Sequence, residues 1–287
     1  MSTVTVVTDS THSMPAATLE RAGVKQVSLY VNHGTRTERE ADMDLDVFYD
    51  RLRSDSKLPT TSQPSIGDFL AVYEPLLDAG QDVLSVHLSG GISGTVETAR
   101  QAAEDALRSR PDRRVEIVDS RSVAGGLGLI VLAAAAGARL GEDAPTVAAR
   151  TREAVRDTRI WFAVDTLEFL RKGGRIGTAQ AWVGGALKIK PILTVDGEVS
   201  PVERVRTSGR AFQRLVTAMH ERVADGAGSW AVQHIQAPDE AERLVAEGRE
   251  IFGCEPELVS EIGPVVGTYA GPGLLGVAGL PPALLGR

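Results

Sequence analysis

The fold class follows from the stretch Val83-Leu84-Ser85-Val86-His87-Leu88-Ser89-Gly90-Gly91-Ile92-Ser93-Gly94-Thr95, in which an apolar run leads into a glycine-rich polar loop. The apolar run predicts a buried β-strand over residues 83–88. The residues after the loop predict a helix that extends to Ser109. A strand, a loop and a helix in this order are typical of a βαβ unit, so the stretch predicts a parallel sheet.

The same rhythm continues on both sides of this stretch. Upstream, residues 3–8 form a β-branched run, and Val27–Val31 predicts a second strand. Downstream, Val115–Val118 predicts another strand, and a long helix rich in glycine and alanine follows it. We therefore expect an N-terminal domain over residues 1–157, a three-layer α/β fold in which helices cover both faces of a parallel sheet.

The pattern changes after about residue 158. Two apolar runs are separated by Asp196-Gly197, which is a strong signal for a β-hairpin. Helices and strands alternate from there to a last expected strand near Glu257–Ile262, and Gly267–Gly276 predicts a glycine-dense loop. These features predict a second α/β domain with a mixed sheet over residues 158–287.

The composition excludes several functional classes. Of 287 residues, 43% are hydrophobic and only 5% aromatic, and the formal net charge is −7, so a nucleic-acid-binding protein is not expected. One cysteine, Cys254, and five scattered histidines offer no ligand spacing for a metal. The sequence shows neither a signal peptide nor an apolar run long enough for an integral membrane segment, so we expect a cytoplasmic protein.

Polar loops follow several expected strands, at the sheet edge where α/β proteins bind ligands. The loops are rich in hydroxyl groups and poor in groups that titrate near neutral pH, so they favour holding a carboxylate or phosphate over transforming it. Ser93 lies where a helix begins and is suited either to bind an anion or to cap the helix. Thr61 is suited either to the same role or to a turn that it stabilises itself.

An enzymatic alternative is a serine esterase or hydrolase that uses Ser89 or Ser93. The residues around both serines depart from the Gly-x-Ser-x-Gly pattern of a nucleophile elbow. A base would have to come from His220 or His234, both of which lie in segments with the periodicity of ordinary helices or strands. A third possibility is a regulatory module that binds another small anion.

Basic residues are concentrated between residues 171 and 214. This segment has nine basic and only three acidic residues, although the whole chain is acidic. Such an island is suited to an anionic partner or a phosphate group, and it is equally consistent with ordinary exposed charges around the hairpin. The basic residues are Arg171, Lys172, Arg175, Lys188, Lys190, Arg204, Arg206, Arg210 and Arg214.

A set of short motifs, in order and spacing, resembles the DegV family of bacterial fatty-acid-binding proteins, which includes the FakB subunits of fatty acid kinase. The resemblance extends over nearly the whole chain. Singly, only the Thr-Ser-Gln-Pro loop and the Lys-Gly-Gly-Arg-Ile motif would suggest it. The motifs are Thr8-Asp9-Ser10, Thr61-Ser62-Gln63-Pro64-Ser65, Leu88-Ser89, Ser93-Gly94-Thr95, Val118-Asp119-Ser120, Lys172-Gly173-Gly174-Arg175-Ile176, Lys190-Pro191-Ile192-Leu193 and Gly271-Pro272-Gly273.

The resemblance implies a non-enzymatic protein whose two domains enclose an apolar tunnel for one long-chain fatty acid, such as palmitate, with no cofactor. The carboxylate-binding residues of the family correspond to Thr61 and Ser93. Ser62, Gly94 and Tyr269 are expected beside them.

The resemblance also implies a partner. In the FakB branch, a kinase subunit phosphorylates the bound carboxylate for phospholipid synthesis, and the residues that meet it correspond to Arg175 and Arg206. Two positions depart from the family pattern. Tyr269 stands where a histidine is usual, and Gly90 replaces a second serine. A tyrosine can hydrogen-bond a carboxylate but carries no positive charge near neutral pH, which weakens the link to a kinase more than the link to fatty acids.

Overall fold

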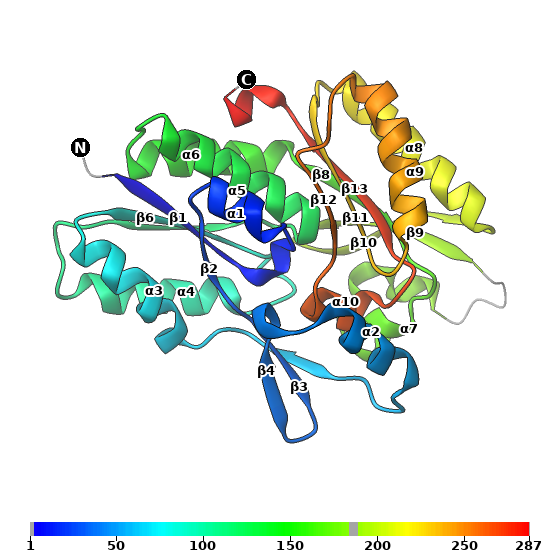
Figure 1. The fold of residues 1–287 in the computed structure, drawn as a ribbon, viewed down its shortest axis with the longest axis horizontal. Coiled ribbons are helices and arrows are strands. Elements are labelled where there is room, and N and C mark those ends of the chain that lie inside the picture. Colours follow the sequence, from blue (N-terminus) through cyan, green and yellow to red (C-terminus); the bar gives the residue numbers. More distant parts are fainter. Residues whose placement is uncertain (1–2, 184–188, 287) are drawn as a thin grey trace.

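The computed structural model describes residues 3–183 and 189–286, and Lys188 of the basic island lies outside them. Its first large sheet, sheet A, is entirely parallel, with the strand order β2-β1-β6-β7. Helices pack on both faces of this sheet (Figure 1), so the predicted three-layer arrangement is confirmed. The elements are β1 (Val4–Asp9), β2 (Lys25–Val27), β6 (Asp82–His87), β7 (Val115–Asp119), α3 (Ile66–Asp78), α4 (Thr95–Leu107), α5 (Ala124–Arg139) and α6 (Ala144–Asp157).

The alternation of side chains along the strands explains the layers. Val83 of β6 packs with the residues of α3 and α4, whereas Leu84 and Val86 belong to the cluster that contains α5. Successive residues of a strand point to opposite faces, so a strand that is covered on both sides buries the residues of both faces. All six residues of β6 are buried, as this geometry requires.

The second large sheet, sheet C, is mixed, as predicted, and has the order β10-β9-β8-β13-β11-β12. Only β11 and β12 pair in parallel. The helices α8 and α9 lie along one face of the sheet (Figure 1). The elements are β8 (Arg159–Ala163), β9 (Lys190–Asp196), β10 (Glu198–Val205), β11 (Ser229–His234), β12 (Leu258–Glu261), β13 (Leu275–Leu280), α8 (Ser208–Ala224) and α9 (Pro238–Phe252).

A third, small antiparallel sheet was not predicted. Its order is β4-β3-β5, and β5 lies inside the segment that the sequence suggested was a loop. The strand expected over 27–31 is in fact divided between β2 and β3. Of the short helices, α10 contacts β3 and β5 of this sheet, and α2 and α7 contact α10. The elements are β3 (Tyr30–His33), β4 (Arg36–Arg39), β5 (Thr60–Ser62), α1 (Ala16–Arg21), α2 (Leu45–Ser54), α7 (Glu168–Lys172), α10 (Pro264–Ala270) and the 3-10 helices Ser10–His12, Glu40–Asp42, Gly177–Trp182 and Pro282–Leu285.

The expected glycine-dense loop over 267–276 is wrong at both ends. Its first residues belong to α10, and its last residues begin β13, which lies between β8 and β11 in the middle of sheet C. The last strand of the chain is therefore β13, and the strand near Glu257–Ile262 is the edge strand β12.

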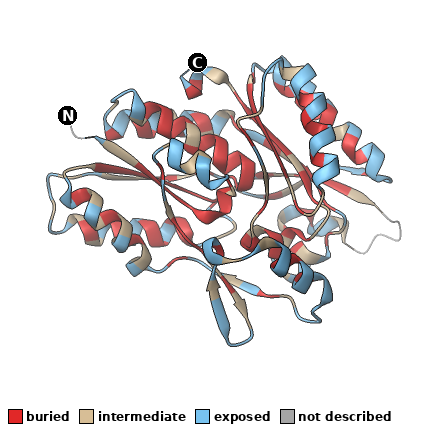
Figure 2. Cartoon of the chain, in the orientation of Figure 1, coloured by how far each residue is buried: buried red, intermediate tan, exposed pale blue. Residues whose placement is uncertain are grey.

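The helix rich in glycine and alanine, α5, connects the two large sheets. It contacts β1 of sheet A and β11 and β13 of sheet C, and most of its residues are buried (Figure 2). Small side chains permit this approach, since a Cβ atom at Gly126 would lie 2.5 Å from Cγ2 of Ile160. One apolar cluster thus extends across residue 158, and the division into domains 1–157 and 158–287 stays a prediction. No helix in the described part of the chain is long and apolar enough to cross a membrane.

Candidate functional site

A cavity of about 370 Å³ lies between sheet C, the first turn of α5 and the loop that follows β6. Its volume falls in the range of ligand pockets in proteins, roughly 300–1,000 Å³. The helix α10 and the strand β5 close it on another side, through Val265, Val266, Tyr269 and Thr61. The cavity therefore has walls from segments that are far apart in the sequence.

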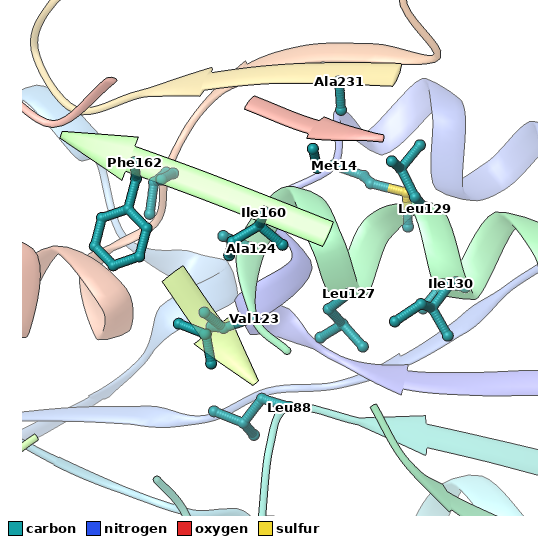
Figure 3. Packing of buried hydrophobic residues seen from close by; sticks show 14 of the residues in the cluster. Met14, Leu88, Val123, Ala124, Leu127, Leu129, Ile130, Ile160, Phe162 and Ala231 are labelled. Carbon is teal, nitrogen blue, oxygen red and sulfur yellow. The ribbon is translucent and has the colours of Figure 1, made fainter. Parts of the chain in front are cut away.

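The interior of the cavity is apolar. Leu88 after β6, Val123 and Ala124 at the start of α5, and Ile160 and Phe162 of β8 all line it. Figure 3 shows Ala124 next to Ile160 within the core, whereas Ala231 of β11 lies apart from Leu88 and Val123. A surface of this kind binds hydrocarbon, because each buried methylene leaves water for an apolar contact.

The polar part of the lining contains every ligand-binding residue that the sequence predicts. Thr61, Ser93 and Tyr269 are half-buried, and Ser62 and Gly94 are exposed. Thr61 Oγ1 and the Tyr269 hydroxyl lie 2.7 Å apart and form a hydrogen bond. The arrangement combines an apolar interior with a group of hydroxyl donors close to solvent.

Distant parts of the chain hold the Thr61–Tyr269 pair in place. Thr61 pairs with Val31 across the ladder of β3 and β5, so it lies on a strand and not in the self-stabilised turn that was one alternative. The N–H of Val265, in the first turn of α10, donates a hydrogen bond to buried Glu40 at 2.8 Å. Burial raises the pKa of Glu40 to about 7, although the hydrogen bonds of Ser10 and Val265 oppose this rise.

Gly173 gives the Tyr269 ring its space, because a Cβ atom there would lie 2.2 Å from the ring. This contact explains the glycine of the Lys-Gly-Gly-Arg-Ile motif.

The loop of Ser93 is held by hydrogen bonds to Ser89. The N–H groups of Ile92 and Ser93 both donate to the Ser89 carbonyl, and the Ser89 hydroxyl donates to the carbonyl of Gly197 in the hairpin of sheet C. The Ser93 hydroxyl lies 2.9 Å from Thr95 Oγ1. The N-cap of α4 is Gly94, without a side-chain cap, so the helix start keeps N–H groups that favour an anion.

Arg175 is the one cation in the described part of the cavity lining. Its guanidinium lies 4.8 Å from the centre of the Tyr269 ring and donates a hydrogen bond to the Gly173 carbonyl at 2.9 Å. The sequence assigned Arg175 to a partner surface only, whereas in the structure its guanidinium also lies beside the hydroxyl cluster of Thr61, Ser93 and Tyr269 in the cavity lining.

Arg206 lies outside the cavity lining, exposed between β10 and α8. Much of the basic island is neutralised, since Arg171, Lys172, Lys190 and Arg214 each form an ion pair. Among the described residues, those of the island without an ion pair are Arg175, Arg204, Arg206 and Arg210.

The hydrolase alternative requires a base beside Ser89 or Ser93. No described histidine hydrogen-bonds Ser89 or Ser93. A serine–histidine–aspartate array does exist, with Ser85 Oγ 2.6 Å from His87 Nε2 and His87 Nδ1 3.1 Å from Asp9 Oδ2, but all three side chains are fully buried. Burial raises the pKa of Asp9, but the hydrogen bonds from His87 and others outweigh it and lower the net pKa.

The array stabilises the end of β6, because Asp9 also accepts a hydrogen bond from the N–H of Leu88 at 2.8 Å. No described group of histidine, cysteine and acidic side chains is placed to hold a metal ion.

Two glutamines of the lining were missed from the sequence. Gln63 is exposed and donates to Thr98 Oγ1 at 2.7 Å, and its amide occupies the space beside Gly94. Gln233 is buried on β11, two residues from Ala231 on the same face. The Thr-Ser-Gln-Pro motif contained a signal for Gln63, whereas nothing in the sequence distinguishes Gln233 from a surface residue.

Comparisons with known proteins indicate the same family over nearly the whole chain. A family model with the description "Uncharacterised protein, DegV family" matches residues 3–281. A DegV domain-containing protein of Clostridium acetobutylicum is 37% identical over 277 residues, 96% of each chain.

Two solved structures share the fold. A DegV family protein from Thermus thermophilus, whose structure is described as showing fatty acid binding, has a TM-score of 0.86 and 34% identity over 97% of this chain and 99% of its own. DegV from Bacillus subtilis, described as a fatty acid binding protein, has a TM-score of 0.87 and 33% identity over 98% of this chain and 100% of its own. On this agreement of sequence, fold and extent, the chain belongs to the DegV family.

Proposed function

We propose that this protein binds one long-chain fatty acid, with the acyl chain in the apolar cavity and the carboxylate at Thr61, Ser93 and Tyr269. The observation that carries the proposal is the combination, in a single cavity, of an apolar interior and a cluster of hydroxyl groups at one part of the lining. The fatty acid binding described for the Thermus thermophilus and Bacillus subtilis relatives supports it.

The energetics of such a ligand match the two parts of the lining. Each buried methylene contributes roughly 0.8 kcal/mol, so about 14 of them contribute on the order of 11 kcal/mol before the costs of ordering. A carboxylate that loses water without new partners costs several kcal/mol. The hydroxyls of Thr61, Ser93 and Tyr269, the backbone N–H groups near Gly94 and the Arg175 guanidinium are the groups that offset this cost.

The described part of the lining contains hydrogen-bond donors for a carboxylate but no general base, so we propose a binding protein that is not an enzyme by itself. It requires no cofactor in this role. We propose that the ligand lies between the domains 1–157 and 158–287. We also propose that the protein acts in the cytoplasm.

We further propose that the bound carboxylate is presented to a partner kinase. Arg175 beside the hydroxyl cluster, and exposed Arg204, Arg206 and Arg210 without ion pairs among the described residues, support an anionic or acidic partner surface. Val199 of β10 lines the cavity, and Arg206 comes directly after the last residue of the same strand. One strand therefore connects the cavity wall with this exposed cation.

The first experiment removes the head-group donors. The Thr61→Ala, Ser93→Ala double variant should bind palmitate or oleate on the order of 100-fold more weakly in a direct titration, because two hydrogen bonds to a charged group are lost. The matched control is Thr60→Ala, since Thr60 is exposed on the same strand and outside the cavity lining. Equal affinity of the double variant and the control would remove these hydroxyls from the site.

The second experiment tests the kinase partner. Arg206→Glu should retain fatty-acid affinity and lose acyl-phosphate formation when a fatty acid kinase subunit and ATP are added. Arg156→Glu, at an exposed position of α6, is the charge-matched control. Normal acyl-phosphate formation by Arg206→Glu would exclude Arg206 from the partner surface.

A further inference from the structure

The cavity has a second polar feature, Gln233, with a side-chain oxygen that has no partner. Gln233 is 3% exposed and belongs to the cavity lining. Its Oε1 atom is buried and accepts no hydrogen bond from any residue in the described part of the chain. A buried amide oxygen without a donor is costly, so it is rare in protein cores.

The orientation of the Gln233 amide is determined by its surroundings. Nε2 donates toward the carbonyl of His12 at 3.1 Å and toward Ser260 Oγ at 2.8 Å, with the carbonyl of Ser13 at 3.4 Å. A carbonyl oxygen only accepts, so the reversed amide would place its oxygen against two other oxygens. The nitrogen therefore faces His12 and Ser13, and the oxygen faces the other way.

The oxygen lies next to the lining of the cavity. A Cβ atom at Gly125 would be 3.2 Å from Gln233 Oε1 and 3.7 Å from Ala231 Cβ, and all three residues line the cavity. Glycine at 125 leaves the side of Oε1 free of any side chain at that position. The described hydrogen bonds of Gln233 do not involve Thr61, Ser93 or Tyr269, so this acceptor is separate from the hydroxyl cluster.

We propose that Gln233 selects a hydroxylated fatty acid, whose chain hydroxyl donates a hydrogen bond to Oε1. This inference rests on the proposed fatty-acid-binding function and specifies its substrate class. A plain methylene beside Oε1 leaves the acceptor unpaired, whereas a hydroxyl at the same place satisfies it. The head group is held at one end, so only a hydroxyl at a matching distance along the chain reaches the amide.

The first test needs only the wild-type protein. Stearate is compared by direct titration with a series of hydroxystearates whose hydroxyl moves from the middle of the chain to its end. At one position the hydroxy acid should bind roughly tenfold more tightly than stearate, because the buried acceptor gains a donor. The oxo acid of the same position has no hydrogen to donate and should not share this gain. An equal gain for the oxo acid would overturn the assignment to Gln233.

The second test uses variants and the ratio of the two affinities, hydroxystearate to stearate. Gln233→Met removes the amide while keeping a similar volume, and it should bring the ratio to about one. Gly125→Ala keeps Gln233 but places a methyl group beside Oε1, and it should reduce the ratio as well. Gln213→Met, at an exposed position of α8, should keep the wild-type ratio.

The outcomes separate this inference from the function on which it rests. If neither acid binds, the fatty-acid function itself is wrong. If stearate binds and no hydroxy acid binds more tightly, the fatty-acid function holds and the role of Gln233 is overturned. Because the wild-type comparison already decides between these outcomes, a Gln233→Met variant that fails to fold leaves the conclusion unaffected.

Discussion

Thr61 Oγ1 and the hydroxyl of Tyr269 form a hydrogen bond of 2.7 Å between residues 208 positions apart in the sequence. The bond joins β5 of the small sheet to α10, which precedes β13, one of the two middle strands of sheet C. Thr61 and Tyr269 thus come from segments far apart in the sequence, and the guanidinium of Arg175 lies over the Tyr269 ring. A change at Tyr269 therefore tests the geometry of the whole cluster.

Replacing Tyr269 by Phe should weaken fatty-acid binding by roughly tenfold or more, because a hydrogen bond to a carboxylate contributes about 1.5–3 kcal/mol. The ring remains, so its contacts with Gly173 and Arg175 are kept. The affinity for palmitate is measured by titration calorimetry. Tyr30→Phe is the control, since the Tyr30 hydroxyl bonds Asp68 at 2.9 Å and Tyr30 lies outside the cavity lining. If both variants bind equally well, Tyr269 makes no contact with the carboxylate.

Replacing Tyr269 by His should make the affinity depend on pH. An imidazole titrates near pH 6.5 in the absence of other influences, and its charged form attracts a carboxylate. The His variant should bind palmitate more tightly as the pH falls from about 8 to about 6, while the wild-type protein changes less over this range. Parallel titration curves for both proteins would contradict the proposed position of residue 269 beside the head group.

The fold could be predicted from the sequence where the pattern is local. The strand–loop–helix order around Val83–Thr95 and the hairpin at Asp196-Gly197 are both present in the structure. β13 was missed because Gly276 and Gly279 interrupt its apolar pattern. Glycine at 276 leaves room for a neighbouring strand, since a Cβ atom at this position would lie 3.2 Å from the Cβ atom of Phe162. β5 was missed because three residues become a strand only through pairing with β3.

Ser13 illustrates the same limit at a helix start. A serine two residues before Pro15 has the sequence pattern of a helix N-cap, but Ser13 has a left-handed backbone with φ of 51°, and its hydroxyl accepts the N–H of Gly263 at 3.0 Å. The hydroxyls of the site were predictable as motifs, because their residue types are characteristic. The apolar walls and Gln233 were not, since ordinary core residues become a cavity only when sheet C and α5 fail to fill the space between them.

Enlarging a side chain of the cavity wall should shorten the preferred acyl chain. Ala231 of β11 lines the cavity, and leucine at this position would take the space of several methylenes. Ala231→Leu should lower the affinity for stearate relative to a shorter acid by about 2 kcal/mol, roughly 30-fold. The ratio of the two affinities is the measurement, and Ala224→Leu, exposed at the end of α8, is the control. A wild-type ratio for Ala231→Leu would place the acyl chain elsewhere.

Glu40 should make the stability of the protein fall as the pH rises. Its carboxyl is buried, accepts the N–H of Val265 at the start of α10, and has its pKa raised from 4.5 to about 7. Between these two pH values the unfolded chain releases the proton while the folded protein retains it, so the free energy of unfolding decreases as the pH rises. Below pH 4.5 both states are protonated and above pH 7 both are ionised, so the effect is confined to this window.

Glu40→Gln keeps an acceptor for Val265 and removes the titration. The free energy of unfolding of the wild-type protein, minus that of Glu40→Gln, should decrease by up to about 3 kcal/mol between pH 4.5 and pH 7 and then stay constant. Urea denaturation at a series of pH values gives this difference, and taking the difference removes the contributions of His12 and His234. Glu250→Gln, exposed on α9, should show no such window. A constant difference for Glu40→Gln would mean that the carboxyl is ionised in the folded protein across the whole range, and that the start of α10 is held by a charged group.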